Sequence, residues 1–275
     1  MKLSKVLTRI YVALVLLFLY APILLLIIFS FNEGRTMSNW TGFSFQWYAQ
    51  LFNDSSLMNA LWITLSIAVI SAVIATILGT MAAIGIHSMK RGRRTAMLNI
   101  SYLPMLNPDI VTGISMMLLF VFFSVQRGYA TLLIAHITFN IPYVIFSVMP
   151  RLKQMKPQMY EAALDLGATP SYALWKVIIP DIRPGITTGA ILAFTLSLDD
   201  FVISMFTAGS AQNLAIKIYA MARRGINPKI NALSAILFVS VALLLVILNR
   251  RSASQQKELK KRERALKKDH TQSSA

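Results

Sequence analysis

The chain contains no cysteine, and its acidic residues are scarce. Among 275 residues there are 11 Asp and Glu against 27 Lys and Arg. Without cysteine, disulfides, thiolate metal sites and cysteine nucleophiles are excluded. The sequence also lacks a G-x-x-x-x-G-K-[ST] loop, so it does not bind and hydrolyse ATP by that route. These absences direct attention to functions other than ATP-dependent or thiol-dependent catalysis.

Apolar residues are abundant instead. They make up 56% of the chain, whereas charged residues make up only 14%. A soluble chain of this length would expose far too much apolar surface with such a composition. The sequence therefore predicts an all-α integral membrane protein with a single transmembrane domain over residues 1–250.

Six apolar runs are long enough to cross a bilayer, which needs about 20 residues per helix. They cover residues 10–31, 60–86, 97–125, 131–149, 185–208 and 230–248. The first is too long for a signal peptide and lacks a small-residue cleavage site, so it is interpreted as a retained span. The third contains Pro104 and Pro108, which predict a break near 104–107 and a new helix from Pro108.

Basic residues indicate how these spans are oriented. Cations precede the first span, follow the second at Lys90–Arg94, and fill a tail at 251–275. By the positive-inside rule, both termini are expected in the cytoplasm. The net charge of +16 is therefore attributed to orientation and to attraction by an anionic inner leaflet, not to nucleic-acid binding.

A polar insert at 151–184 separates the fourth and fifth runs. Pro157 suits the first turn of a helix, Gly167 can end it in a left-handed conformation, and Thr169-Pro170 provides an N-cap and an N1 proline. We expect a short helix, a sharp bend and a second helix. Glu161 and Asp165 form a like-charged i,i+4 pair, which suggests cationic neighbours or a cationic partner.

The same insert carries a family resemblance. Glu161-Ala162-Ala163, Gly167 and then Pro180 resemble the coupling motif of permease subunits in binding-protein-dependent ABC importers, with conservative departures at Val177 and Ile179. Further segments resemble the spermidine/putrescine branch, and its second, C-type permease in particular. They are Asn107–Gly113, His136–Phe139 and Phe194–Asp200.

The resemblance implies a type I importer fold of six spans in a bacterial plasma (inner) membrane. It implies a second, related permease, two ATPase subunits and an extracytoplasmic polyamine-binding protein, with ATP and Mg held by the ATPase and no cofactor on this chain. The coupling motif occurs only once here, consistent with a separate second permease. The expected coupling residues are Glu161, Ala162, Ala163, Asp165, Gly167, Ala168 and Pro180.

Two adjacent carboxylates lie inside the fifth apolar run. Asp199 and Asp200 are about 21 Å from its cytoplasmic end at 1.5 Å per residue. Each ionised Asp near a helix centre costs about 2.5 to 3.5 kcal/mol. If both were helical, they would point about 100° apart and serve two surfaces, one of them a translocation path. The alternative is that both are satisfied within the bundle.

Other polar residues have two interpretations as well. Asp109 suits the first turn of a helix, or contact with a transported cation. His136 and Asn140 share a helix face; hydrogen bonding between packed helices is favoured over lining a cavity. Ser197 and Phe201 are expected neighbours of the path.

Three rival functions remain open. An importer of another cation, or of an anion, would keep the coupling motif and use the aspartate pair structurally. A six-span channel would need no coupling insert. An intramembrane aspartyl protease would need two aspartates facing each other from different helices, whereas Asp199 and Asp200 are adjacent.

Overall fold

The computed structural model describes residues 2–35, 39–223, 228–243 and 246. Throughout these residues the chain is helical apart from short connections and one isolated bridge between Asn32 and Phe43. The basic tail at 251–275 and the end of the sixth predicted run lie outside the described residues. Two compact units are formed, one by Met1–Asp54 with Met221–Ala275 and the other by Ser55–Ala220.

The first unit contains α1 (Lys2–Phe29), α2 (Gln46–Phe52) and a further helix, Pro228–Leu243. Between α1 and α2 the chain folds around Asn32, whose amide accepts from Thr41 N (2.9 Å) and donates to Asn39 O (2.9 Å). Lys229 Nζ lies 3.3 Å from Asp54 Oδ2. This unit therefore has a local polar core beside a long apolar helix.

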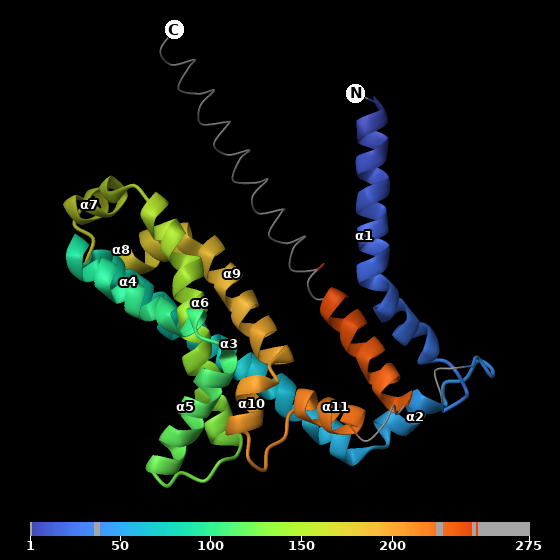
Figure 1. Cartoon of the computed structure of the whole chain (residues 1–275). Coiled ribbons are helices and arrows are strands. Elements are labelled where there is room, and N and C mark those ends of the chain that lie inside the picture. Colours follow the sequence, from blue (N-terminus) through green and yellow to red (C-terminus); the bar gives the residue numbers. More distant parts are fainter. Residues whose placement is uncertain (1, 36–38, 224–227, 244–245, 247–275) are drawn as a thin grey trace. The chain divides into compact units, whose positions relative to one another are not determined.

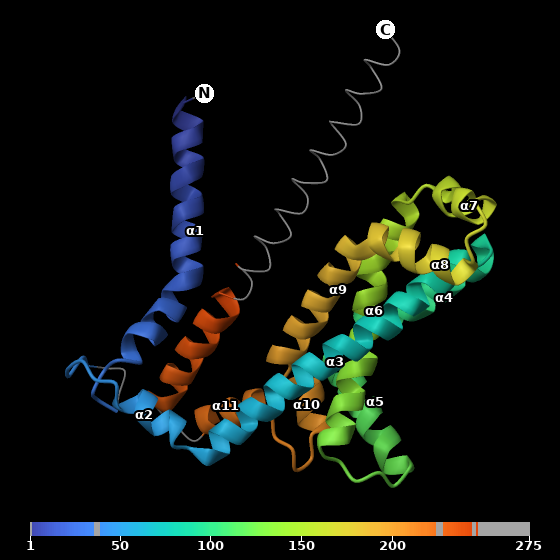
Figure 2. The same ribbon diagram turned by 180° about the vertical axis from the view of Figure 1, so that it is seen from behind.

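The second unit holds the candidate site and is drawn from two sides in Figures 1 and 2. Its helices are α3 (Ser55–Ser88), α4 (Arg91–Leu106), α5 (Asp109–Phe122), α6 (Tyr129–Gln154), α7 (Pro157–Asp165), α8 (Pro170–Ala173), a π-helical turn η1 (Leu174–Ile178), α9 (Ile179–Asp199) and α10 (Val202–Thr207), together with α11 (Leu214–Arg223) as far as Ala220.

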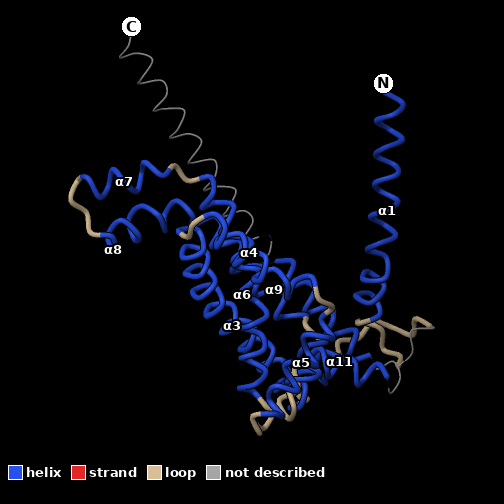
Figure 3. Tube along the Cα trace, turned by 60° about the vertical axis from the view of Figure 1, so that its left-hand side comes forward, coloured by secondary structure: helices blue, strands red, loops and turns tan. Residues whose placement is uncertain are grey.

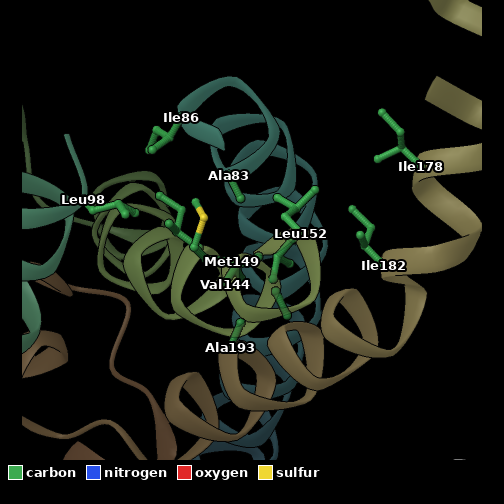
Figure 4. Close-up of a cluster of buried hydrophobic side chains, with 12 residues drawn as sticks. Ala83, Ile86, Leu98, Val144, Met149, Leu152, Ile178, Ile182 and Ala193 are labelled. Atoms are coloured by element: carbon green, nitrogen blue, oxygen red, sulfur yellow. The ribbon is translucent and has the colours of Figure 1, made fainter. Parts of the chain in front are cut away.

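Close packing of α6 against α3 and α9 forms the core of the second unit. A Cβ added at Gly79 of α3 would lie 2.7 Å from Val144 Cβ, and one at Gly189 of α9 would lie 3.3 Å from Val144 Cα. Small residues allow such close approach between membrane helices. Figure 4 shows the buried side chains around Val144 and Met149, which α3, α4, α6, η1 and α9 contribute together.

Four helices are long and apolar enough to cross a membrane: Val6–Phe29, Ser55–Ser88, Tyr129–Gln154 and Pro170–Asp199. A fifth span arises if α4 and α5 are counted together, although they bend by 101° at their junction. The predicted break near 104–107 is confirmed there. Pro108 is the N-cap of α5, and Asp109 is its first residue.

The predicted fifth run at 185–208 is wrong at both ends. Helical structure begins at Pro170, so the second helix of the polar insert is continuous with this span, and it ends at Asp199. Pro180 and Pro184 do not end the helix. The π-helical turn just before Pro180 is the kind of local adjustment that accommodates residues lacking a backbone donor.

Candidate functional site

The first half of the polar insert forms a short helix with a precise end. α7 begins at Pro157, as predicted. At its C-terminus Gly167 has φ +86°, which confirms the predicted left-handed conformation. Gly167 N donates to Leu164 O (2.9 Å), and Ala168 N donates to Ala163 O (3.0 Å). These two bonds are the Schellman pattern, so the bend satisfies carbonyls that would otherwise be unpaired.

The second half begins with the expected cap. Thr169 is the N-cap of α8, its hydroxyl accepts from Tyr172 N (3.3 Å), and Pro170 follows at the first helical position. Figure 3 shows α7 and α8 joined by the short loop between them. The insert is therefore a helix–bend–helix unit whose far end leads directly into α9.

Much of the insert's surface is open. Glu161, Ala162, Asp165 and Pro180 are exposed, while Ala163 and Ala168 are half-buried. Leu166, beside the bend, is 89% exposed, the largest fraction among the exposed large apolar side chains of the described residues. An apolar tip flanked by exposed acids is a suitable surface for another protein to bind.

Asp199 and Asp200 lie at a helix break, so the expectation that both are helical is wrong. Asp199 is the last residue of α9, whereas Asp200 has an extended conformation (φ −62°, ψ 121°). α10 starts two residues later, at Val202. The angle of about 100° between adjacent helical side chains therefore does not apply to this pair.

Asp200 is held by the helix that follows it. Its Oδ1 accepts from Ile203 N (3.2 Å), and its Oδ2 accepts from Ser204 N (2.8 Å) and Ser204 Oγ (2.7 Å). Only 8% of its side chain is exposed. The first backbone donors of α10, which have no partner within the helix, are thereby satisfied by a carboxylate.

A buried histidine completes this cluster. His136 Nε2 lies 3.0 Å from Ser204 Oγ and 3.5 Å from Asp200 Oδ2. Asn213 Nδ2 also donates to Ser204 Oγ (2.8 Å). Because the only hydroxyl proton of Ser204 goes to Asp200, His136 must donate from Nε2. Ser204 of α10 thus joins His136 of α6, Asp200 and Asn213, the residue before α11.

Asn140 lies in a second buried cluster, one turn further along α6. Its Nδ2 donates to Ser197 Oγ (2.7 Å), and Ser197 Oγ lies 3.0 Å from Ser71 Oγ. Asn140 is fully buried, and Ser197 is 1% exposed. These contacts support the interpretation of His136 and Asn140 as interhelical hydrogen-bonding residues. They also place Ser197 in the core, away from the surface of this chain.

Asp199 differs from its neighbour because it remains exposed. No side-chain hydrogen bond or ion pair to Asp199 is formed within the described residues. Phe201, on the other side of Asp200, is half-buried and packs its ring 4.6 Å from that of Tyr219. An exposed carboxylate with no partner among the described residues can attract a cation by Coulomb interaction.

Asp109 is exposed at the first turn of α5, where a negative charge is favourable for the helix dipole. Among the residues that the structure describes, the Asp109 side chain forms no hydrogen bond or ion pair. Within the described residues, no group of three or more His, Asp or Glu is placed to hold a metal ion.

Ser71, Ser204 and Asn213 were missed by the sequence reasoning. Ser204 carried a signal, because it follows Asp200 by four residues and an aspartate just before a helix commonly caps it. Ser71 and Asn213 carried no such local signal. Their partners lie 126 and nine residues away, respectively, and only the packed helices bring them together.

Comparison with known proteins agrees with this architecture. Residues 75–257 match the family described as binding-protein-dependent transport system inner membrane component. The chain belongs to this family of transporter permeases.

Two curated relatives are close in sequence. Over 231 residues the chain is 41% identical to the spermidine/putrescine transport system permease protein PotC of Escherichia coli K12, covering 84% of this chain and 87% of the relative. It is 39% identical over 237 residues to the putrescine transport system permease protein PotI of the same strain, covering 82% and 84%. The chain is thus homologous to polyamine ABC transporter permeases.

Solved structures share the fold at lower identity. A bacterial ABC transporter involved in the import of the acidic polysaccharide alginate has a chain that matches with a TM-score of 0.68 and 19% identity, over 92% of this chain and 98% of that one. An inward-facing MetNI methionine ABC transporter matches with a TM-score of 0.60 and 18% identity, over 72% and 95%. The fold is that of ABC importer permeases.

Proposed function

We propose that this chain is the permease of an ATP-driven importer that moves spermidine or putrescine across the bacterial inner membrane. The observation that carries the substrate assignment is the exposed Asp199 carboxylate at the break between α9 and α10. The neighbouring carboxylate, Asp200, already accepts a hydrogen bond from Ser204. The polyamine permeases among its relatives support the same substrate class.

We propose six spans for this chain. They are the four long apolar helices, the bent pair α4–α5, and the helix that starts at Pro228. We place both termini in the cytoplasm, with a single permease domain over 1–250 and the basic tail at 251–275 on the inner leaflet. The cations at Lys90–Arg94 support that orientation.

Coupling to ATP hydrolysis is assigned to the insert at 151–184. Its exposed Leu166, Glu161 and Asp165 form the surface for a separate ATPase subunit, which binds ATP and Mg. The chain itself binds no cofactor in this proposal. Because α8, η1 and α9 are one continuous helix, a push on the insert is transmitted along about 45 Å of helix toward Asp199.

The proposed cycle is alternating access. Two related permeases and two ATPase subunits receive a polyamine from an extracytoplasmic binding protein. Asp199 then replaces part of the water around an ammonium group during transit, while Asp200 keeps α10 in place. Asp109 and Phe201 are the further residues of this chain assigned to the path. Ser197, His136 and Asn140 act by fixing the helices that border it.

The alternative is an importer of a different small solute, in which Asp199 has no role in transport. Ligand-dependent ATP hydrolysis distinguishes the two. The chain is purified with its native partners, placed in lipid, and assayed with binding protein plus spermidine, putrescine, a monovalent cationic amino acid or an anionic solute. We expect stimulation by a polyamine. Stimulation by one of the other solutes, with no response to either polyamine, would overturn the assignment.

A further inference from the structure

The space behind the coupling segment is a pocket of about 730 Å³. It is bounded by the ends of α3 and α6 on one side and by α7, α8 and η1 on the other. Its volume lies within the range of about 300 to 1,000 Å³ that is usual for ligand sites. No residue assigned to the polyamine path lines it.

The walls of this pocket are apolar. Ile84 of α3, Leu152 of α6, and Leu174 and Ile178 of η1 line it. Figure 4 shows Leu152 and Ile178 on their separate helices beside the buried core. An apolar recess at the end of membrane-crossing helices is suited to a hydrocarbon chain, because burying each CH₂ is favourable by about 0.8 kcal/mol.

The segments around the pocket are basic, although Glu161 is the one Asp, Glu, Lys or Arg among the residues that line it. His87 lines it, and Arg94 and Lys153 are close enough to act on His87 electrostatically. Residues 84–94 and 151–161, which run past the pocket, contain seven Lys and Arg and one acid, Glu161. Neither Arg94 nor Lys153 is in an ion pair with another described residue. This excess of cations in the segments around the pocket favours an anionic head group.

We propose that this pocket binds an anionic phospholipid of the inner leaflet, with an acyl chain between the apolar walls and the phosphate on the side of Arg94 and Lys153. α3 is 34 residues long and would span about 51 Å, so its end passes beyond a hydrocarbon core of about 30 Å. We place this end of α3, and the pocket beside it, at head-group depth. Basic recesses between helices on the cytoplasmic side are a recurring form of lipid site.

The lipid has a mechanical consequence. It would fill the space between α7 and the bundle, so that a push on the insert moves α9 instead of closing the gap. The position of this lipid on the cytoplasmic side follows from the proposed orientation. Its binding does not depend on the transported solute, so a permease for another solute would still bind it.

The test counts lipids retained by the complete transporter. Complexes are reconstituted with equal amounts of phosphatidylglycerol and phosphatidylethanolamine, extracted gently, and weighed by native mass spectrometry. Ile84→Trp fills the pocket, with Ile77→Trp as the control, because Ile77 is on the same helix and 55% exposed. Leu174→Phe fills the opposite wall if the first variant does not assemble.

We expect Ile84→Trp and Leu174→Phe to lose one retained phosphatidylglycerol per copy of this chain, and Ile77→Trp to keep it. Arg94→Gln combined with Lys153→Gln should lower the preference for the anionic lipid by roughly tenfold or more. Equal lipid retention in wild type and both filled variants would overturn the proposal, as would retention without preference for the anionic head group. A space filled by the ATPase instead would appear as no retained lipid in the wild-type complex.

A failure of the proposed function is separable from these results. If ATP hydrolysis by the complex does not respond to polyamines, the substrate assignment is wrong. The number of retained lipids would be unchanged in that case. Conversely, loss of the lipid in a complex that still transports polyamines at the normal rate would contradict only the mechanical role.

Discussion

Two connections between helices carry the functional polar residues, and they are stabilised in different ways. The bend between α7 and α8 is satisfied almost entirely by its own backbone, through Gly167, Ala168 and the Thr169 cap. The break between α9 and α10 depends on side chains from distant parts of the chain, including His136 and Asn213. A change at the bend should therefore act locally, whereas a change at the break should affect several helices.

The largest effect is expected for Asp200→Ala. It removes the acceptor for two backbone donors of α10 and for the Ser204 hydroxyl in a buried setting, which should cost about 3 kcal/mol. Heat-induced loss of the purified complex should shift to a clearly lower temperature. Asp199→Ala is the control, because exposed Asp199 makes no such contacts. If Asp199→Ala and Asp200→Ala lower this temperature equally, the two carboxylates contribute equally to stability, and the account is contradicted.

Gly167→Val should have a smaller, local effect. No atom lies within 4 Å of an added Cβ, so the cost is conformational and comes from φ +86° with a β-branched residue, about 2 kcal/mol. Hydrogen exchange at 157–165 should become faster while α3 and α6 stay protected. Gly92→Val is the matched control, since Gly92 also has free space around it but is helical. Unchanged exchange in Gly167→Val would contradict the account of the bend.

Thr169→Ala should have the smallest effect. It removes one side-chain cap from a short exposed helix, worth about 1 kcal/mol. Exchange of the Tyr172 amide should accelerate by up to fivefold. Thr169→Ser keeps the hydroxyl and should behave as wild type. If the serine and alanine variants behave alike, the 3.3 Å contact to Tyr172 N contributes nothing.

The same two connections show what the sequence could predict. The helix–bend–helix form of the insert could be predicted from residue types and spacing. Its determinants, Pro157, Gly167 and Thr169-Pro170, act through the backbone of their own segment. The break before α5 was predictable for the same reason, because Pro108 disfavours a helical residue before it. Local chemistry of this kind is independent of how the helices pack.

The break at Asp199 could not be predicted in this way. Residues on both sides are apolar, and neither proline nor glycine marks an end between Ala190 and Ala208. The break is held by Asp200 and by hydrogen bonds from α6 and from Asn213, whose proximity depends on tertiary packing. The fifth run was predicted to start at 185, whereas the helix already runs through a π-helical turn and Pro180 before that residue. Hydropathy therefore located the span but not its limits.

The division of roles between Asp199 and Asp200 is tested most directly by polyamine uptake in reconstituted complexes. Asparagine keeps the shape of aspartate and still caps helices, but it has no charge. We predict that Asp199→Asn assembles normally and that its uptake falls by roughly ten- to hundredfold, from loss of one charge-assisted contact. Asp200→Asn should transport whenever it assembles, and Asp181→Asn, at the exposed start of α9, should resemble wild type. Full uptake by Asp199→Asn, or loss of uptake by an intact Asp200→Asn complex, would contradict the account.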